Sequence, residues 1–527
     1  MATLFEIGGV VLAPLFVGIL ISFCVEQLLR PRPLLQNRRL QAFAMHLGLW
    51  LLFFALGLAV WQRPIFASGL NVAGLLLIVL VSNAKFASLR EPFLLSDFRF
   101  FKALLRHPRL YLPFFGVAPA IGCAVIFVFF CVLALRSEPS IWSRLGIIGF
   151  VWWCLITVVA GAALLWIGSR RLVPITLDPV SDLQTFGLLG SFVRYWQEER
   201  AISPKAVAEK LQGVFSVQAK PRLPQDLPHL VAVQCESFFD ARRVFKGVHS
   251  GVLKHFDALR KVSSRAGCLN VPAWGANTVR TEFAFLSGIA PNALGVHRFN
   301  PYRRLARQGV PTIASELKKH GYRTVCVHPF SAEFYDRDKV FPALGFDEFI
   351  DISAFSAEEN SGPYIGDLAV AEKVRTLLRD ATKPLFIFVI TMENHGPLHL
   401  ERVAKGDEDR LYASAPPAGY EEFTIYLRHL QHTDVMLGEI HAAINATARG
   451  GWLCAYGDHV PILSGVYGAS GFADGRTDYV IVGPAGTPIE AHEYDVAPEN
   501  LALDLLRSAG LAERVIAKPV VAATSPS

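Results

Sequence analysis

Five long runs without a charged residue occupy the first third of the chain. Each run is long enough to cross about 30 Å of hydrocarbon as a helix. The first run lacks a basic segment before it and a small-residue cleavage site after it, which favours a retained anchor over a removable signal peptide. The pattern predicts an α-helical membrane domain with five transmembrane helices in residues 1–169. The predicted spans are 7–25, 40–62, 64–84, 110–135 and 145–169.

A different pattern begins near residue 223, after a polar linker at 170–222 whose amphipathic stretch 183–199 is expected to lie along the membrane surface. Short runs rich in β-branched and aromatic residues alternate with helical segments, which predicts a mostly parallel sheet covered on both faces. This α/β domain is expected to extend over residues 223–512, followed by a tail at 513–527. The expected strands are 230–234, 323–327, 385–390, 452–455 and 479–482, and the expected helices are 310–320, 366–378 and 420–446.

Composition supports this division. The chain has 527 residues, of which 52% are hydrophobic and only 18% charged, and its mean hydropathy of +0.35 is typical of a protein with a membrane domain. The net charge of +6 suits contact with anionic lipids or an anionic polymer and gives no support for nucleic acid as a partner. Eight scattered cysteines without a Cys-x-x-Cys pair indicate small buried side chains and not a disulfide framework.

Polar residues with metal- or phosphate-binding chemistry follow four of the expected strands. In open α/β sheets, ligands bind outside the carboxyl ends of the strands. Such residues at four strand ends therefore indicate one site more strongly than any of the short motifs does alone. The residues are Glu236, then His328, then Glu393, Asn394 and His395, and then Asp458 and His459.

Four of these candidate residues predict a metal site with a nucleophile. Glu236, Asp458 and His459 offer carboxylate and imidazole ligands, and Thr278 lies in a turn before the apolar run 283–288. A divalent metal lowers the pKa of a hydroxyl that it binds, and this creates a nucleophile at neutral pH. Each residue also has an ordinary interpretation. A Glu at a strand end is often a helix cap, an Asp-His pair is common by chance, Thr278 could be an N-cap, and Thr281 is the rival nucleophile.

Three further residues are candidates for holding a phosphate group. His328 and His395 could donate to phosphate oxygens or to the leaving group, and the guanidinium of Arg337 could bind a phosphate with two parallel hydrogen bonds. The alternatives are structural histidines and a surface ion pair.

The set formed by Glu236, Thr278, Asp458 and His459 on a five-span anchor resembles lipoteichoic acid synthase and related phosphoglycerol transferases, in the sulfatase-like branch of the alkaline phosphatase superfamily. In the spans, the resemblance rests on the segments 83–85, 89–92 and 96–97. It implies that Glu236, Thr278, Asp458 and His459 are the metal ligands, with Thr278 also the nucleophile. It assigns head-group binding to His328, Tyr335, Arg337 and His395.

The resemblance also implies a reaction. The Thr278 oxygen attacks the phosphorus of phosphatidylglycerol, or of another phospholipid donor, and expels diacylglycerol. A hydroxyl of a cell-envelope glycan or glycolipid then accepts phosphoglycerol. The implied cofactor is one divalent ion, Mn²⁺ first, with Mg²⁺ or Zn²⁺ as alternatives. The sequence differs from the family pattern in three places: residues 276–282, Tyr335, where Trp is typical, and residues 392–397. These differences leave open which acceptor is used and which head group is transferred. The Cys/Ser-x-Pro-x-Arg signature of true sulfatases is absent, which argues against sulfate-ester hydrolysis.

The charge of the loops and the family resemblance predict opposite sides of the membrane for the α/β domain. The basic loops at 30–39 and 85–109, counted by the positive-inside rule, would put the α/β domain in the cytoplasm. The resemblance instead implies a multi-pass protein of the cell (inner) membrane with an extracytoplasmic catalytic domain, and we follow it because large domains translocate largely regardless of flanking charge. The functions kept beside phosphoglycerol transfer are phosphoethanolamine transfer, a membrane-anchored phosphodiesterase or other hydrolase, and a non-catalytic scaffold.

Overall fold

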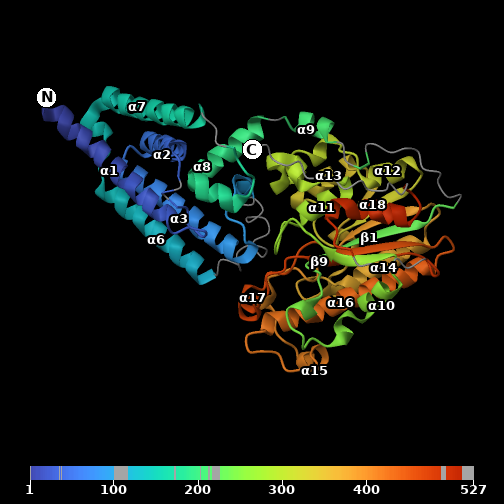
Figure 1. Ribbon diagram of the computed structural model, residues 1–527. Coiled ribbons are helices and arrows are strands. Elements are labelled where there is room, and N and C mark those ends of the chain that lie inside the picture. Colours follow the sequence, from blue (N-terminus) through green and yellow to red (C-terminus); the bar gives the residue numbers. More distant parts are fainter. Residues whose placement is uncertain are drawn as a thin grey trace. The chain divides into compact units, whose positions relative to one another are not determined.

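The computed structural model describes residues 2–34, 36, 38–99, 117–170, 174–201, 203–211, 214–215, 226–487 and 494–512. The predicted tail at 513–527 and part of the predicted linker at 170–222, namely residues 171–173, 202, 212–213 and 216–222, lie outside these residues. The chain divides into two compact units, Met1–Ser203 and Pro204–Ser527 (Figure 1). Each unit is described separately.

In the first unit, the described residues form helices and connecting turns and contain no strand. Four of its helices contain apolar segments long enough to cross a membrane: Gly9–Glu26, Leu40–Trp61, Pro64–Leu89 and Trp142–Arg170. They confirm four of the five predicted spans. The remaining span, 110–135, falls partly on residues 100–116, which lie outside the described residues, and its described apolar helix Ala124–Ser137 is shorter. The full helices are α1 (Ala2–Glu26), α2 (Leu40–Trp61), α3 (Pro64–Leu89), α6 (Val117–Ser137), α7 (Trp142–Arg170) and α8 (Pro179–Ala201).

Helix α8 contains the amphipathic stretch that was expected along the membrane surface. Its apolar side chains Leu183, Leu188 and Phe192 are buried in the core of the first unit. The buried carboxylate of Glu26, at the end of α1, accepts a hydrogen bond from the backbone N–H of Leu188 at 2.9 Å. These apolar residues of α8 therefore pack against other residues of the first unit, whereas the sequence predicts that they lie along the membrane surface.

The second unit is built on a seven-stranded sheet with the order β2-β9-β8-β1-β7-β3-β4. All pairs among β8, β1, β7, β3 and β4 are parallel, whereas β9 is antiparallel to both β8 and β2. This confirms the predicted mostly parallel sheet. The strands are β1 (His229–Cys235), β2 (Arg265–Leu269), β3 (Arg323–Val327), β4 (Glu348–Ile350), β7 (Leu385–Ile390), β8 (Gly451–Gly457) and β9 (Thr477–Val482). A separate hairpin pairs β5 (Asn360–Ser361) with β6 (Tyr364–Ile365).

Consecutive side chains of a central strand point to opposite faces of the sheet. Both faces of the central strands are apolar, and helices cover both of them. Val231 and Val233 of β1 belong to one apolar core, and Leu230 and Ala232 belong to the other. Figure 1 shows the two helical layers. One layer contains α11 (Thr278–Ser287), α12 (Ile313–Lys319), α13 (Arg337–Ala343) and α18 (Pro498–Ser508), and the other contains α10 (Lys254–Val262), α14 (Asp367–Arg379) and α16 (Glu421–Asn445). The shorter helices are α9 (Pro204–Lys210), α15 (Asp407–Leu411) and α17 (Ser464–Ser470).

Candidate active site

The carboxyl ends of two neighbouring strands bring three predicted ligands together. Strands β1 and β8 are parallel, and Cys235 pairs with Gly457 in their register. The next residues, Glu236 on one chain segment and Asp458 and His459 on the other, therefore leave the sheet side by side. All three are buried, and their ligand atoms lie within 4.8 Å of one another. The predicted convergence of Glu236, Asp458 and His459 is thus present in the structure.

The hydrogen bonds of His459 orient its ring as a ligand. Its Nδ1 lies 3.1 Å from the carbonyl oxygen of Val460, an acceptor to which only a protonated Nδ1 can donate. In the neutral ring, Nε2 then carries a lone pair. That Nε2 lies 3.2 Å from Oδ2 of Asp458 and 3.6 Å from Oε1 of Glu236. A lone pair facing two carboxylates is the arrangement that a bound cation stabilises.

One of the two carboxylates also lacks a full set of donors. Among the residues that the structure describes, no donor satisfies Oδ2 of Asp458 by a hydrogen bond, although the atom is buried. Burial and the neighbouring charge of Asp458 raise the pKa of Glu236 to about 8. Both observations fit a site for a divalent cation, because hard oxygen donors and one imidazole suit Mn²⁺, Mg²⁺ or Zn²⁺.

Ser237 connects the ligands through strained backbone. Its φ of 53° lies in the left-handed region, which is uncommon for a residue other than glycine. In this conformation its N–H donates to Oδ1 of Asp458 at 2.9 Å, and its hydroxyl donates to Oε1 of Glu236 at 2.9 Å. Asn277, directly before Thr278, is a second left-handed residue, with φ of 67°. Such strain is often found at functional sites.

Thr278 is the first residue of α11, and Asn277 occupies the N-cap position, so the interpretation of Thr278 as the cap is wrong. The rival nucleophile Thr281 is fully buried, and its hydroxyl donates to the backbone carbonyl of Asp458 at 2.8 Å. This bond holds the first turn of α11 against the end of β8. Thr278, three residues earlier on the same side of the helix, is only partly buried.

Arg337 and His328, two predicted phosphate-binding residues, contact each other. Nη1 of Arg337 lies 3.2 Å from Nε2 of His328, while Nδ1 of His328 lies 3.1 Å from the carbonyl oxygen of Ile390. Burial and the charge of Arg337 lower the pKa of His328, which keeps the ring neutral. Both ring nitrogens are therefore engaged in this structure. The guanidinium also binds Glu282, with Nε to Oε1 at 3.1 Å and Nη2 to Oε2 at 2.7 Å.

Glu282 is a buried charged residue of this cluster that was not predicted from the sequence. It is buried on α11, binds Arg337 with both oxygens, and accepts a hydrogen bond from the hydroxyl of Tyr302 at 2.6 Å. The only signal in the sequence was a carboxylate placed directly before the apolar run that begins at Phe283. A carboxylate in a buried helix needs a charged partner, but the sequence does not name that partner.

The other two predicted head-group residues lie near this cluster. The ring of Tyr335 lies 5.3 Å from the guanidinium carbon of Arg337, and burial raises the pKa of Tyr335 to about 12. Nδ1 of His395 lies 2.6 Å from the carbonyl oxygen of Gly396, so Nε2 carries the lone pair when the ring is neutral. The pKa of His395 is lowered by burial, which favours the neutral form.

Two relatives of known name are similar to this chain over different lengths. The chain is 29% identical to the capsular polysaccharide biosynthesis protein RkpI of Rhizobium meliloti over 491 residues, which are 87% of this chain and 86% of the relative. It is 26% identical to lipoteichoic acid synthase 2 of Bacillus subtilis over 192 residues, 35% of this chain and 28% of that one. The second match confirms the predicted resemblance to lipoteichoic acid synthases, over a part of their length.

One solved structure shares the fold along most of the chain. The integral membrane lipooligosaccharide phosphoethanolamine transferase A of Neisseria meningitidis covers 90% of this chain and is itself covered to 95%, with a TM-score of 0.52 and 12% sequence identity. The family model "Sulfatase" matches residues 228–511, which include every predicted site residue. Because this match extends over more than half of the 527 residues, the chain belongs to the sulfatase family, whose members are metal-dependent enzymes.

Proposed function

We propose that this protein transfers phosphoglycerol from phosphatidylglycerol to a hydroxyl of a cell-envelope glycan or glycolipid. The observation that carries the proposal is the cluster of Glu236, Asp458 and His459 beside the first turn of α11, where Thr278 begins the helix. The same chain has four helices that are long and apolar enough to cross a membrane. A phospholipid donor suits such an anchored site better than a soluble substrate does.

Thr278 acts as the nucleophile in this proposal. Its oxygen forms a bond to the phosphorus of the donor, its proton is lost, and the bond from phosphorus to the diacylglycerol oxygen breaks, so that diacylglycerol leaves after taking up a proton. A divalent ion held by Glu236, Asp458, His459 and Thr278 would lower the pKa of the hydroxyl and neutralise charge on the phosphate oxygens. The acceptor hydroxyl then attacks the same phosphorus and restores free Thr278.

The remaining site residues orient the phosphoglycerol group. The N-terminal N–H groups of α11 lie beside Thr278 and can donate to phosphate oxygens, which the helix dipole favours. Glu282 fixes the plane of the Arg337 guanidinium, and the ring of Tyr335 lies next to it. We also assign His395 to head-group binding. We assign His328 to positioning Arg337, because its two ring nitrogens contact Arg337 and the carbonyl oxygen of Ile390. We expect Mn²⁺ as the ion, with Mg²⁺ or Zn²⁺ as alternatives.

The names of the relatives support the donor and acceptor classes. Lipoteichoic acid synthase 2 supports phosphoglycerol as the transferred group, and the capsular polysaccharide biosynthesis protein supports a glycan acceptor. A transferase for envelope glycans acts where these polymers are completed. We therefore place the α/β domain on the extracytoplasmic side of the cell membrane, which reporter fusions to the C-terminus would test.

The test is mass spectrometry of the Thr278 peptide. The purified full-length chain in detergent is incubated with phosphatidylglycerol and Mn²⁺ without an acceptor. We expect release of diacylglycerol and a glycerophosphoryl group on Thr278. A parallel reaction with phosphatidylethanolamine should leave the peptide unmodified, and a phosphoethanolamine adduct there would instead favour phosphoethanolamine transfer. Release of diacylglycerol without any adduct would favour hydrolysis, and no release from either lipid with metal bound would refute the transferase.

A further inference from the structure

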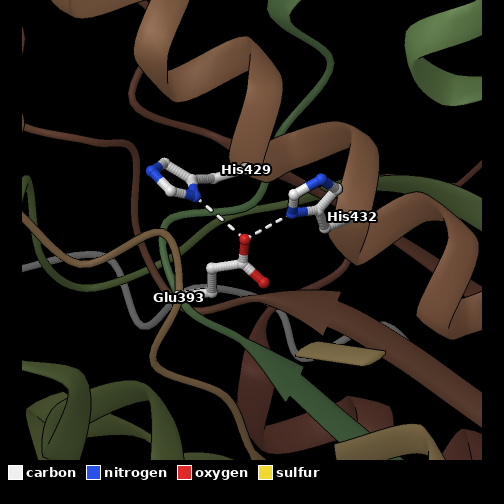
Figure 2. A group of neighbouring side chains, drawn as sticks. All are labelled: Glu393, His429 and His432. Carbon is white, nitrogen blue, oxygen red and sulfur yellow. Dashed lines mark hydrogen bonds and ion pairs between the residues drawn. The ribbon is translucent and has the colours of Figure 1, made fainter. Parts of the chain in front are cut away.

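A second group of metal-ligand side chains shares no residue with the candidate active site. Glu393 follows β7, and His429 and His432 project from α16 (Figure 2). Nδ1 of His429 lies 2.9 Å from Oε1 of Glu393, and Nδ1 of His432 lies 2.6 Å from the same oxygen. All three ligand atoms lie within 4.8 Å of one another. The proposed function uses none of these three residues.

The arrangement has the geometry of a ligand set. His429 and His432 are three residues apart on one helix, so their rings lie on the same face. Both rings present Nδ1 to one carboxylate oxygen (Figure 2). The hydroxyl of Ser361 lies 2.6 Å from that oxygen and 3.5 Å from Nδ1 of His432. Two imidazoles and a carboxylate form a common three-ligand set for Zn²⁺ in proteins.

Neighbouring residues form hydrogen bonds to the atoms of His429 and Glu393 that do not face the centre of the group, as is usual around metal ligands. Nε2 of His429 lies 3.1 Å and 3.0 Å from the two carboxylate oxygens of Glu401, which gives a carboxylate–histidine pair behind the proposed ligand atom. The second oxygen of Glu393, Oε2, accepts a hydrogen bond from the N–H of Asp367 at 2.7 Å. Each of these contacts leaves the Nδ1 or Oε1 atom directed toward the centre of the group.

The charge around the group also favours a cation. The buried carboxylates of Glu393 and Asp367 and the partly buried carboxylate of Glu401 lie around the two histidines. A divalent ion at the centre of the group would offset this negative charge. The side chain of His432 is 31% exposed, which provides a route for the ion.

We propose that Glu393, His429 and His432 bind a divalent transition metal ion, with Zn²⁺ as the best fit to their donor atoms. This ion would be separate from the one at Glu236, Asp458 and His459. Its role would be to fix the loop after β7. In that loop, Thr391 accepts a hydrogen bond from the N–H of Glu236 at 2.9 Å, and Asn394 donates to the carbonyl oxygen of Glu236 at 2.9 Å. The second metal would thus position a ligand of the first.

Metal stoichiometry tests this proposal independently of the lipid reaction. The full-length chain in detergent is stripped with a chelator, equilibrated with Zn²⁺ alone, and analysed for zinc per chain. We expect two equivalents for the wild type, one for Asp458→Asn, one for His432→Gln, and none for the double variant. His441→Gln is the matched control, because His441 lies on the same helix and contacts Asn445 instead of the group, and it should bind two equivalents.

A second variant and a spectroscopic signal distinguish loss of this metal site from misfolding of the chain. Glu401→Gln keeps all three ligands and should weaken zinc binding at this site by roughly 10–100-fold, because it removes the carboxylate behind His429. With Co²⁺ in the Asp458→Asn background, a visible absorption band from nitrogen ligands should appear and should vanish when His432→Gln is added. Two zinc equivalents in folded His432→Gln, or none in folded Asp458→Asn, would overturn the proposal.

Discussion

Oγ1 of Thr281 donates a hydrogen bond of 2.8 Å to the backbone carbonyl oxygen of Asp458. This bond joins the first turn of α11 to the end of β8, two elements that are far apart in the sequence. It fixes Thr278, which lies one helical turn earlier, relative to the strand end that carries Asp458 and His459. The position of the proposed nucleophile therefore depends on a neighbouring threonine that does not itself react.

The two threonines are expected to differ on substitution. Thr278→Ala removes the attacking oxygen and should lower the rate of diacylglycerol release by about 10³-fold or more, which is about 4 kcal/mol of barrier. Thr278→Ser should retain measurable activity. Thr281→Val keeps the shape of the Thr281 side chain, which only positions the helix. It should lower the rate of diacylglycerol release less than Thr278→Ala does. The rates are compared at saturating Mn²⁺, and a variant Thr278→Ala that still cleaves the donor at the wild-type rate would disprove the assignment.

Metal binding at the candidate active site should depend on pH through Glu236. The pKa of this carboxyl in the metal-free protein is raised to about 8 by burial and by Asp458. A ligand must lose its proton to bind a metal, so affinity should fall as pH decreases below about 8. Calorimetric titration with Mn²⁺ near pH 7, in buffers of different ionisation enthalpy, should show proton release. Glu236→Gln should abolish that release, and equal proton release by this variant would contradict the prediction.

The ion pair between Glu282 and Arg337 is buried, with both side chains at most 2% exposed. Glu282→Ala would leave an uncompensated guanidinium in the core and should destabilise the fold by about 3–5 kcal/mol. The double variant Glu282→Leu with Arg337→Met removes both charges and should be more stable than Glu282→Ala. Thermal unfolding of the three proteins measures this order. A double variant that melts below Glu282→Ala would show that the pair is not the source of the penalty.

His229 should make the second unit sensitive to acid. It lies at the start of β1, and its Nδ1 accepts a hydrogen bond from the N–H of Leu385 at 3.2 Å. Burial, with a smaller effect of Arg449, lowers the pKa of His229 to about 4. Because the unfolded chain binds the proton more tightly, this contribution to stability is present above about pH 6.5 and decreases as pH falls toward 4.

The expected size of this effect is about 1–3 kcal/mol at pH 4. His229→Gln keeps a hydrogen-bond acceptor and cannot titrate in this range. The melting temperature of the wild type should therefore fall more steeply than that of His229→Gln between pH 6.5 and 4.5. Parallel melting curves for the two proteins would exclude His229 as a source of acid sensitivity.

The central strands could be predicted from sequence because they are continuous apolar runs. The expected strands 323–327 and 385–390 agree with β3 and β7 at both ends. The edge strands β2 and β4 were missed, since β2 contains Arg265 and Gly267, and β4 has only three residues. The start of α11 was also missed by five residues, because its first turn is polar and lacks the periodicity of a buried helix.

The candidate site was predictable only where strand order determines it. Glu236 and Asp458 follow parallel neighbours, so their convergence follows from the rule for strand ends. The partner of Arg337 could not be predicted in this way, because Glu282 comes from a helix whose rotation depends on packing. The cluster of Glu393, His429 and His432 was missed for a similar reason. The strand pattern predicts Glu393 at a strand end, but the two histidines lie within the long helix α16, and the sequence pattern does not show which strand end they face.

Helix α16 contacts two of the loops that carry ligands. The hydroxyl of Tyr426 donates to the carbonyl oxygen of Ser237 at 2.7 Å, and His429 and His432 contact Glu393. An α-helix turns by about 100° per residue, so one inserted or deleted residue between Tyr426 and His429 would rotate one contact away from the other. Homologous chains should therefore vary in side-chain identity along this helix far more readily than in the number of residues between these two positions.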